Sequence, residues 1–409
     1  MSLILELPDV MCTQAVRAVF KALEARGGQG CVRFVGGCVR NVVMGHVPSD
    51  LDLATQLTPD ETEAALDAAG LKSVPTGKAF GTITAVVDGE PYEITSLRED
   101  VETDGRRAVV SYTTDWGLDA QRRDFYLNAL YADGLGQVYD PTGQGLDDAR
   151  QGRVRFIGEA EQRIREDYLR ILRFFRFTAG YGRAVDQVSL EACVGLKAGI
   201  DGLSGERIWQ ELIKTLALAD PMLAFEAMQQ TGLMPQVMPG WHLVAQDIAE
   251  LRAMVAQTRD PERRLLALID AGLGLTPDAL DALRTRLKFS TRVYDRFVTA
   301  GLVADCLASD EDLVFGRLIY RFGREAVEDA LMLIAAHRGR SADLVLGLLG
   351  DVVVPAFPLR GADLIARGLK AGPEVGQRLK QIETEWVNND FSQTVIDDSL
   401  DQIGKRTKH

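Results

Sequence analysis

The sequence predicts an α+β protein, with β-strands in the first ~150 residues and a largely helical remainder. Short strand-like runs occur between residues 31 and 97, and one of them alternates strictly between polar and apolar residues. From about residue 117 the apolar spacing becomes that of helices. Because 409 residues are enough for two or three domains, we expect domains at residues 1–148, 149–222 and 223–409.

The first elements follow from local patterns. Residues 12–26 place apolar side chains on one helical face. The run CVRFVGG, residues 31–37, is a strand that leads into a tight turn, and residues 38–45 form a short helix that ends at Gly45. The run SDLDLAT, residues 49–55, alternates as a half-buried strand does.

The next elements carry clear boundary signals. Residues 58–70 form a helix, because Thr58 is a good N-cap, Pro59 occupies the first helical position and Glu61 can complete a capping box. The runs GTITAVVD and PYEITSLR are strands joined by the turn DGEP. The polar residues 99–121 are expected to form an exposed loop.

The bulk composition excludes several classes of protein. A net charge of −13 argues against non-specific coating of nucleic acid, but it is compatible with a local basic surface. No apolar run approaches the ~20 residues that span a membrane. The cysteines and histidines are scattered, which predicts a reducing cytoplasm and disfavours disulfides, a zinc site and a histidine-based metal hydrolase.

Asp50 and Asp52 are the candidate catalytic residues. On one strand they share a face, about 7 Å apart at the Cα atoms. Such a pair suits one or two hard cations, Mg²⁺ above all, which can activate a hydroxyl and stabilise a leaving pyrophosphate. Taken alone, the motif is better explained by two solvated acids on an exposed strand.

Gly36 and Gly37 stand between the expected strand and helix. Without side chains they let phosphate oxygens approach backbone N–H groups, and Arg40 is placed to reach the same phosphates. Two glycines alone are about equally well explained as a plain turn. The order of strand, Gly-Gly, helix with arginine and Asp-x-Asp is more specific, and it indicates a metal-bound triphosphate.

The stretch VGGCVRNVVMGHVPSDLDLAT resembles the signature of the class II CCA-adding enzyme and poly(A) polymerase family. These proteins are nucleotidyltransferases of the polymerase-β type, with the pattern Gly-Gly-x-Val-Arg-Asp and then Asp-x-Asp ten residues after the arginine. Arg40 and Asp50 keep that spacing, whereas Asn41 stands where the family usually has Asp. The resemblance implies a polymerase-β-type head, a mixed sheet with helices, followed by an all-α neck, body and tail.

Further motifs follow in the family's order. The run RRDFYLNAL resembles Arg-Arg-Asp-Phe-Thr-x-Asn-Ala, with Tyr126 in place of the usual Thr. This implies that Arg123 contacts the nucleotide and that Asp124 and Asn128 support the site. Glu93 is either a third carboxylate near the metals or, more simply, a strand-surface acid.

Two other segments match the family. Residues 104–116 resemble a flexible loop that shapes the site for the incoming base. Residues 203–216 resemble the last motif, in which Ser204 caps a helix. The side chains expected to brace the neck are Glu206, Arg207 and Glu211.

Residues 165–177, REDYLRILRFFRF, are predicted to be a helix with polar side chains every three residues. From the residues alone, a solvated basic face with Asp167 paired to Arg170 is as good an explanation as a ligand face. The match to Glu-Asp-x-x-Arg-x-x-Arg-x-x-Arg-Phe implies the ligand face, with Arg173 and Arg176 as further nucleotide contacts.

Asp167 and Arg170 have the chemistry of a base reader. Cytosine and adenine both present an exocyclic amine beside an acceptor ring nitrogen, whereas guanine and uracil present a carbonyl beside an N–H. An aspartate accepts from the amine and an arginine donates to the ring nitrogen. The pair therefore selects C and A and rejects G and U, which would leave polar groups unpaired.

The resemblance implies an enzyme that adds C, C and A to the tRNA 3′ end from CTP and ATP, with Mg²⁺ as cofactor. A poly(A) polymerase with the same core is the alternative, disfavoured because no long basic extension is present. Addition of only A or only CC also stays open, and the sequence sets no oligomeric state. A non-catalytic RNA-binding relic is disfavoured because the acids are present. The acceptor stem of tRNA would contact basic clusters such as residues 284–296, although a solvated helix face explains that cluster somewhat better.

Overall fold

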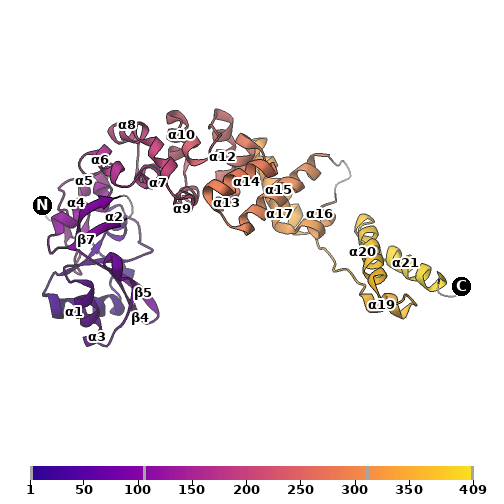
Figure 1. Cartoon of the computed structure of the whole chain (residues 1–409), viewed down its shortest axis with the longest axis horizontal. Coiled ribbons are helices and arrows are strands. Elements are labelled where there is room, and N and C mark those ends of the chain that lie inside the picture. Colours follow the sequence, from indigo (N-terminus) through magenta and orange to yellow (C-terminus); the bar gives the residue numbers. More distant parts are fainter. Residues whose placement is uncertain (1–2, 105–106, 310–313, 407–409) are drawn as a thin grey trace. The chain divides into compact units, whose positions relative to one another are not determined.

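The computed structural model describes residues 3–104, 107–309 and 314–406. The chain divides into two compact units, Met1–Gly240 and Trp241–His409. In Figure 1 the sheet lies within the indigo and purple part of the first unit, and the orange and yellow second unit is built from helices. None of the helices in the described part of the chain is long and apolar enough to cross a membrane.

The core of the first unit is a seven-stranded mixed sheet of order β3-β4-β5-β2-β1-β8-β9. In its middle, β1 pairs antiparallel with β2, and β2 runs parallel to β5. Of these strands, β1 confirms the strand predicted before the Gly-Gly turn, and β2 confirms a strand at the Asp-x-Asp segment. The strands are β1 (Val32–Val35), β2 (Asp52–Thr55), β3 (Lys72–Gly77), β4 (Thr82–Val87), β5 (Glu90–Ser96), β8 (Tyr131–Ala132) and β9 (Val138–Tyr139).

The helices α1 (Gln14–Gly27) and α3 (Pro59–Ala68) pack against each other and against strands of the sheet. Phe20 of α1 contacts Phe34 of β1, with ring centroids 4.9 Å apart. The predicted capping box of α3 is confirmed, because Thr58 and Glu61 each accept a hydrogen bond from the other's backbone N–H. This packing joins the two helices to β1, β3, β4 and β5.

The expectation of a loop over residues 99–121 is wrong. The segment contains β6 (Arg98–Asp104) and β7 (Arg107–Tyr112), which pair with each other as a separate two-stranded sheet, and then α4 (Trp116–Gln121). Strands that join no larger sheet need not alternate between polar and apolar residues as half-buried strands do. The polar composition of this segment therefore led to the wrong prediction of a loop. Residues 105–106 lie outside the described part of the chain.

The continuous helix expected over residues 165–177 is also corrected. It is divided between α6 (Ala160–Glu166) and α7 (Leu169–Tyr181), because Asp167 has an extended backbone with φ −158°. The Asp167 carboxylate accepts a hydrogen bond from the Leu169 N–H at 3.1 Å. Aspartate competes in this way with helix hydrogen bonds, and it favours helix starts over helix interiors.

Behind α7, helices fill the rest of the first unit. Phe174 and Phe175 of α7 are fully buried, and α7 packs against α9 and α10. The remaining helices of this unit are α2 (Gly37–Val43), α5 (Gly145–Gln151), α8 (Gln187–Gly195), α9 (Gly205–Leu216), α10 (Met222–Thr231) and α11 (Met234–Val237).

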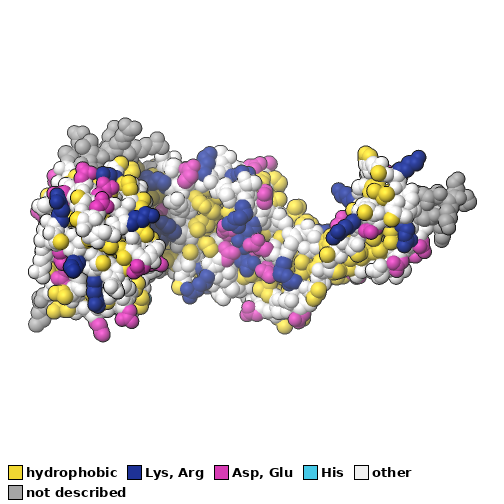
Figure 2. Space-filling model, turned by 90° about the horizontal axis from the view of Figure 1, so that it is seen from below, with side chains coloured by type: hydrophobic (Ala, Val, Ile, Leu, Met, Phe, Trp, Pro, Cys, Tyr) yellow, Lys and Arg dark blue, Asp and Glu magenta, His cyan; other side chains and the backbone are white. Residues whose placement is uncertain are grey.

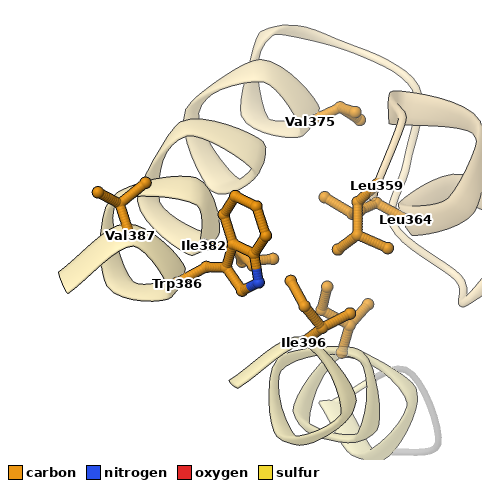
Figure 3. Close-up of a cluster of buried hydrophobic side chains, with 8 residues drawn as sticks. Leu359, Leu364, Val375, Ile382, Trp386, Val387 and Ile396 are labelled. Carbon is orange, nitrogen blue, oxygen red and sulfur yellow. The ribbon is translucent and has the colours of Figure 1, made fainter. Parts of the chain in front are cut away.

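Every regular element in the described residues of the second unit is a helix, as the sequence predicts. One apolar cluster surrounds Val327 and Leu349, and another gathers around Trp386, whose indole lies near Ile382 in Figure 3. The helices are α12 (Ala245–Gln257), α13 (Pro261–Leu273), α14 (Pro277–Leu287), α15 (Thr291–Ser309), α16 (Phe315–Phe322), α17 (Arg324–His337), α18 (Asp343–Gly350), α19 (Gly361–Ala366), α20 (Pro373–Asn388) and α21 (Gln393–Arg406).

The basic cluster at residues 284–296 is partly engaged within the second unit. Arg296 donates to the fully buried Asp329 at 2.7 Å and to Glu262 at 2.8 Å. Arg292 also pairs with Glu262. On the face shown in Figure 2, basic and acidic side chains are interspersed. Contacts between this cluster and tRNA therefore stay a prediction.

Candidate active site

One pocket of about 550 Å³ in the first unit is lined by the residues that the sequence analysis named for metal or nucleotide binding, with the exception of Glu93. The pocket brings together the Gly-Gly turn, the Asp-x-Asp segment, the residues before η3 (Tyr126–Asn128) and α7. The named residues are Gly36, Gly37, Arg40, Asp50, Asp52, Arg123, Asp167, Arg170, Arg173 and Arg176. Other residues of the lining are Asp124, Asn128, Phe177 and Tyr181.

Only one of the two candidate metal ligands, Asp50 and Asp52, lies on a strand. Asp52 is the first residue of β2, whereas Asp50 lies in the bend before it. The predicted strand geometry of the pair is therefore wrong, although both acids line the pocket. The physical reason is the end of β1 at Val35: the residues that would pair with Asp50 already belong to the Gly-Gly turn and α2.

The electrostatic surroundings of Asp52 fit a divalent cation. Partial desolvation raises the pKa of Asp52, and the negative charges of Glu93 and Asp50 raise it further, while Arg123 opposes them. Glu93 faces Asp52 across the parallel β2–β5 pair and is outside the pocket lining. A hard cation would relieve this repulsion between carboxylates, and oxygen donors are the ligands that such a cation prefers.

Two carboxylates do not complete a metal shell. Among the residues that the structure describes, no group of three or more His, Cys, Asp or Glu side chains is arranged to hold a metal ion. Mg²⁺ is commonly bound by one or two carboxylates together with substrate phosphates and water. The residues present therefore fit a metal that arrives with a nucleotide.

The Gly-Gly turn needs glycine at its first position. Gly36 has φ +70°, a conformation that side chains disfavour, and a Cβ there would point toward the Arg123 guanidinium 3.5 Å away. The turn thus keeps the space between β1 and Arg123 open.

Arg40 is 5% exposed and is fixed in the pocket wall. Its guanidinium donates to Asn128 Oδ1 at 2.6 Å and to Asn41 Oδ1 at 2.8 Å, and it lies 3.7 Å from the ring centroid of Tyr181. Burial lowers the pKa of Arg40. Asn41 therefore keeps the acceptor that the family's Asp would provide, but without its negative charge.

Arg123 is positioned by Asp119, a residue that the sequence analysis missed. Arg123 Nη2 lies 3.0 Å from Asp119 Oδ2, and the Tyr131 hydroxyl donates to the same oxygen at 2.7 Å. Asp119 is only 1% exposed. Burial alone would raise the pKa of Asp119, but the adjacent Arg123 and Arg122 lower it to about 2. The sequence signal that could have revealed this ion pair is the spacing of four residues between Asp119, on α4, and Arg123, just after α4.

Asp119→Asn is expected to lower the free energy of unfolding at pH 7 by about 2 kcal/mol, the equivalent of a pKa shift from 3.8 to about 2. Because the folded pKa lies below the unfolded one, ionised Asp119 stabilises the fold above about pH 4. This stabilisation is lost as the pH falls toward 2. Urea unfolding of both proteins between pH 7 and pH 3 measures it.

The exposed Asp147 on α5 provides the matched control for that acid-to-amide change. Asp147→Asn should leave the free energy of unfolding nearly unchanged at every pH. A difference between the wild type and Asp119→Asn that did not shrink on acidification would contradict the assigned charge interaction.

A chain of hydrogen bonds crosses the pocket floor. Asn128 accepts from Arg40 and donates through Nδ2 to Asp124 Oδ1 at 3.0 Å, and Asp124 Oδ2 accepts from Arg173 Nε at 2.8 Å. The chain links α2 to α7 through Asp124, which precedes η3, and Asn128, the last residue of η3. The Tyr126 hydroxyl accepts from the Gly158 N–H at 3.1 Å, so this departure from the family pattern is used to join two loops.

The two members of the expected base-reading pair bond to other residues. Asp167 Oδ2 lies 2.7 Å from Arg207 Nη2, whereas Arg170 donates to Glu166 and to the Arg163 carbonyl. The alternative in which Asp167 pairs with Arg170 is therefore wrong. Both side chains still line the pocket.

Residues 203–216, the last family motif, include α9, and side chains of α9 hold those of α7 in place. Glu211, 4% exposed, accepts from Arg176 Nε at 2.6 Å and lies 3.8 Å from Arg173. Arg207 of the same helix contacts Asp167. Ser204 occupies the N-cap position of α9 but its side chain makes no capping hydrogen bond, and Glu206 is exposed.

Comparison with known families agrees with this arrangement. Residues 32–155 match the family described as Poly A polymerase head domain, and residues 184–243 match the one described as Probable RNA and SrmB- binding site of polymerase A. The fold and the site thus define a nucleotidyltransferase with a polymerase-β-type head.

Relatives specify the family more closely. The chain is 32% identical over 386 residues to the human protein named CCA tRNA nucleotidyltransferase 1, mitochondrial, a match that covers 91% of this chain and 86% of the relative. It is 30% identical over 376 residues to the CCA-adding enzyme of Lactobacillus delbrueckii subsp. bulgaricus, with 90% and 92% covered. The chain belongs to the family of CCA-adding enzymes, or CCA tRNA nucleotidyltransferases.

A solved structure supports the same assignment. The crystal structure of the Bacillus stearothermophilus CCA-adding enzyme in complex with CTP has a TM-score of 0.78 and 26% sequence identity, and the match covers 97% of each chain. A Thermotoga maritima CCA-adding enzyme complexed with tRNA shares the fold at 16% identity, with a TM-score of 0.66 and coverage of 98% of this chain and 100% of that one.

Proposed function

We propose that this protein adds C, C and A to the 3′ end of tRNA, without a nucleic-acid template, from CTP and ATP. The observation that carries the proposal is the single pocket that contains both the Asp50/Asp52 pair and the Asp167/Arg170 pair. One pair sits where a triphosphate would react and the other where a nucleobase would be recognised. Family membership supports the same activity.

The metal is assigned to Asp50 and Asp52. Family membership implies a divalent cation, and Mg²⁺ is the cation that suits two carboxylates supplemented by phosphate oxygens. When bound, it would lower the pKa of the attacking 3′ hydroxyl and neutralise charge on the departing pyrophosphate. The pKa of Asp52 is raised first by burial and then by repulsion from Glu93 and Asp50, and a bound cation would relieve that repulsion.

The arginines of the pocket bind and orient the triphosphate. Arg40, Arg123 and Arg173 are each fixed by an acceptor in the protein, respectively Asn128, Asp119 and Asp124. Cations that are already oriented need little reorganisation when charge develops on the phosphates. Their side chains also lose less conformational freedom when the nucleotide binds.

Asp167 and Arg170 retain the capacity to read a base. Asp167 accepts one hydrogen bond on each carboxylate oxygen, from Leu169 N–H and Arg207, and each oxygen can accept another. Arg170 donates through Nη1 and Nη2 to Glu166 and two carbonyls, which leaves its Nε–H available. These existing bonds would fix both side chains while they contact the amine and ring nitrogen of C or A.

The RNA would approach along basic helices outside the pocket.

We place the reaction in the cytoplasm. The described cysteines are free thiols, which suits a reducing compartment. The human relative, in contrast, is named mitochondrial.

The experiment uses a tRNA transcript that ends at the discriminator base. It is incubated with the protein and Mg²⁺, with each nucleoside triphosphate alone and then with CTP and ATP together. We expect C and C from CTP alone, and three added residues that end in A from the mixture. A transcript that already ends in CCA is the matched control and should not be extended. A long A tract, or only CC or only A from the mixture, would contradict the proposal.

A further inference from the structure

A second pocket, of about 1120 Å³, opens at the opposite end of β1 and β2 from the candidate active site. Its lining includes Gln29 and Gly30, which precede β1, and Gln56, which follows β2. The two pockets share no residue. Since the four residues of β1 extend over about 10 Å, the second pocket is a separate site.

Arg33 of β1 lies in this pocket over two aromatic rings. Its Cζ atom is 4.1 Å from the ring centroid of Trp116 and 3.7 Å from that of Tyr139. The Arg33 Nε atom is buried and has no hydrogen-bond partner among the described residues. Desolvation lowers the pKa of Arg33, although the nearby Tyr139 and Asp133 oppose this effect. A guanidinium that is oriented by stacking on aromatic rings, and whose Nε–H has no hydrogen-bond acceptor, can bind an anionic ligand without first losing another partner.

The acids of the pocket are already engaged by donors of the protein. Glu24 accepts from the Gly30 N–H at 3.1 Å. Asp133 accepts from the N–H groups of Leu135 and Gln137 at 2.9 and 3.0 Å, and from the Tyr139 hydroxyl at 3.1 Å. Among the described residues, neither acid forms an ion pair with Arg33.

Two further cations of the lining are equally unpaired. Arg17 and Lys21, on α1, form no ion pair with any acid in the part of the chain that the structure describes. The three cations of the lining outnumber its two acids, Glu24 and Asp133, which stay charged, so the pocket carries a small net positive charge. Met11, and Val16 and Phe20 of α1, add apolar side chains to the same lining.

We propose that this pocket binds a nucleoside triphosphate, whose polyphosphate contacts Arg33, Arg17 and Lys21 and whose base packs on the apolar side chains of the lining. A multiply charged anion matches several cations better than a single carboxylate does, and the volume is sufficient for a whole nucleotide. The planar edge of Arg33 suits two phosphate oxygens at once. The inference does not depend on the proposed CCA addition.

Trp116 provides a site-specific signal, because it contacts Arg33 directly. The full-length protein is labelled with 5-fluorotryptophan, and the Trp116 resonance is assigned with Trp116→Phe. ATP is then titrated, with sodium tripolyphosphate and tRNA in separate arms. The other tryptophans, Trp209, Trp241 and Trp386, lie outside this pocket and are internal controls for binding elsewhere.

We expect a saturable shift of the Trp116 resonance with ATP and a weaker one with tripolyphosphate. In Arg33→Met the shift should require about tenfold or more higher ATP, as when a charged hydrogen bond is lost. Arg33→Lys should bind with intermediate affinity. Circular dichroism checks the fold, and the double variant Arg17→Met/Lys21→Met, on an exposed helix face, gives a second test if Arg33→Met unfolds.

Three results would overturn the proposal. The first is a Trp116 resonance that ignores ATP up to millimolar concentrations. The second is an equal shift in the wild type and in the Arg33 and double variants. The third is a shift with tRNA alone, which would assign the pocket to an RNA phosphate.

Discussion

Asp52→Asn is expected to reduce nucleotide addition by a factor of about 10³ or more, because loss of a metal-ligating carboxylate removes several kcal/mol of charge stabilisation. The fold should be retained. Since the folded pKa of Asp52 lies above its ordinary value, ionised Asp52 destabilises the fold at neutral pH, and the amide should be at least as stable as the wild type. Single-turnover addition of C to truncated tRNA and thermal unfolding measure the two effects.

Asp67→Asn is the matched control for this change. Asp67 is an exposed acid on α3 outside the pocket, so the same acid-to-amide substitution should leave the rate of addition unchanged. If Asp52→Asn kept more than a tenth of the wild-type rate, Asp52 would not be a metal ligand. If it lost activity only because the protein unfolded, the stability measurement would reveal it.

Asp167→Ala is expected to reduce discrimination between CTP and UTP by about 10²-fold, the equivalent of one hydrogen bond to a charged group. Arg170→Met should have a similar effect on ATP against GTP. The change should come from slower use of the correct nucleotide and faster use of the wrong one. Values of kcat/KM for all four nucleoside triphosphates measure it.

Arg165→Met is the control for Arg170→Met. Arg165 is exposed, pairs with Glu161 and is outside the pocket, so its loss should leave base selection intact. Because Asp167 also contacts Arg207, Asp167→Ala could act through α9 instead of through the base. An equal loss of rate with all four nucleotides would indicate this structural role and exclude base reading by Asp167.

The sequence predicted which residues meet in the pocket better than it predicted their local geometry. The motifs around Gly36, Asp50, Arg123 and Asp167 are short and keep fixed spacings, so each could be recognised locally. The strand position of Asp50 could not, because it depends on where the neighbouring β1 ends. The β6–β7 ribbon was missed for a related reason. Each of its two strands is defined by pairing with the other, and the local sequence does not reveal that pairing.

Residues that position the site were harder to predict than those that line it. Asp119 fixes Arg123, but an acid four residues before an arginine is common on any exposed helix. Arg207 reaches Asp167 across 40 residues of sequence, and Glu211 reaches Arg176 across 35. Such contacts arise from the packing of α7 on α9, which no local pattern encodes.

In the proposed reaction, one nucleotide bridges the acid pair and the base-reading pair in a single pocket. A crystal structure of this protein with Mg²⁺ and a non-hydrolysable CTP analogue tests it most directly. We expect metal density between Asp50, Asp52 and the triphosphate, with the cytosine amine on Asp167 and its ring nitrogen on Arg170. A nucleotide whose phosphates lie away from Asp50 and Asp52, or whose base points away from Asp167 and Arg170, would contradict it.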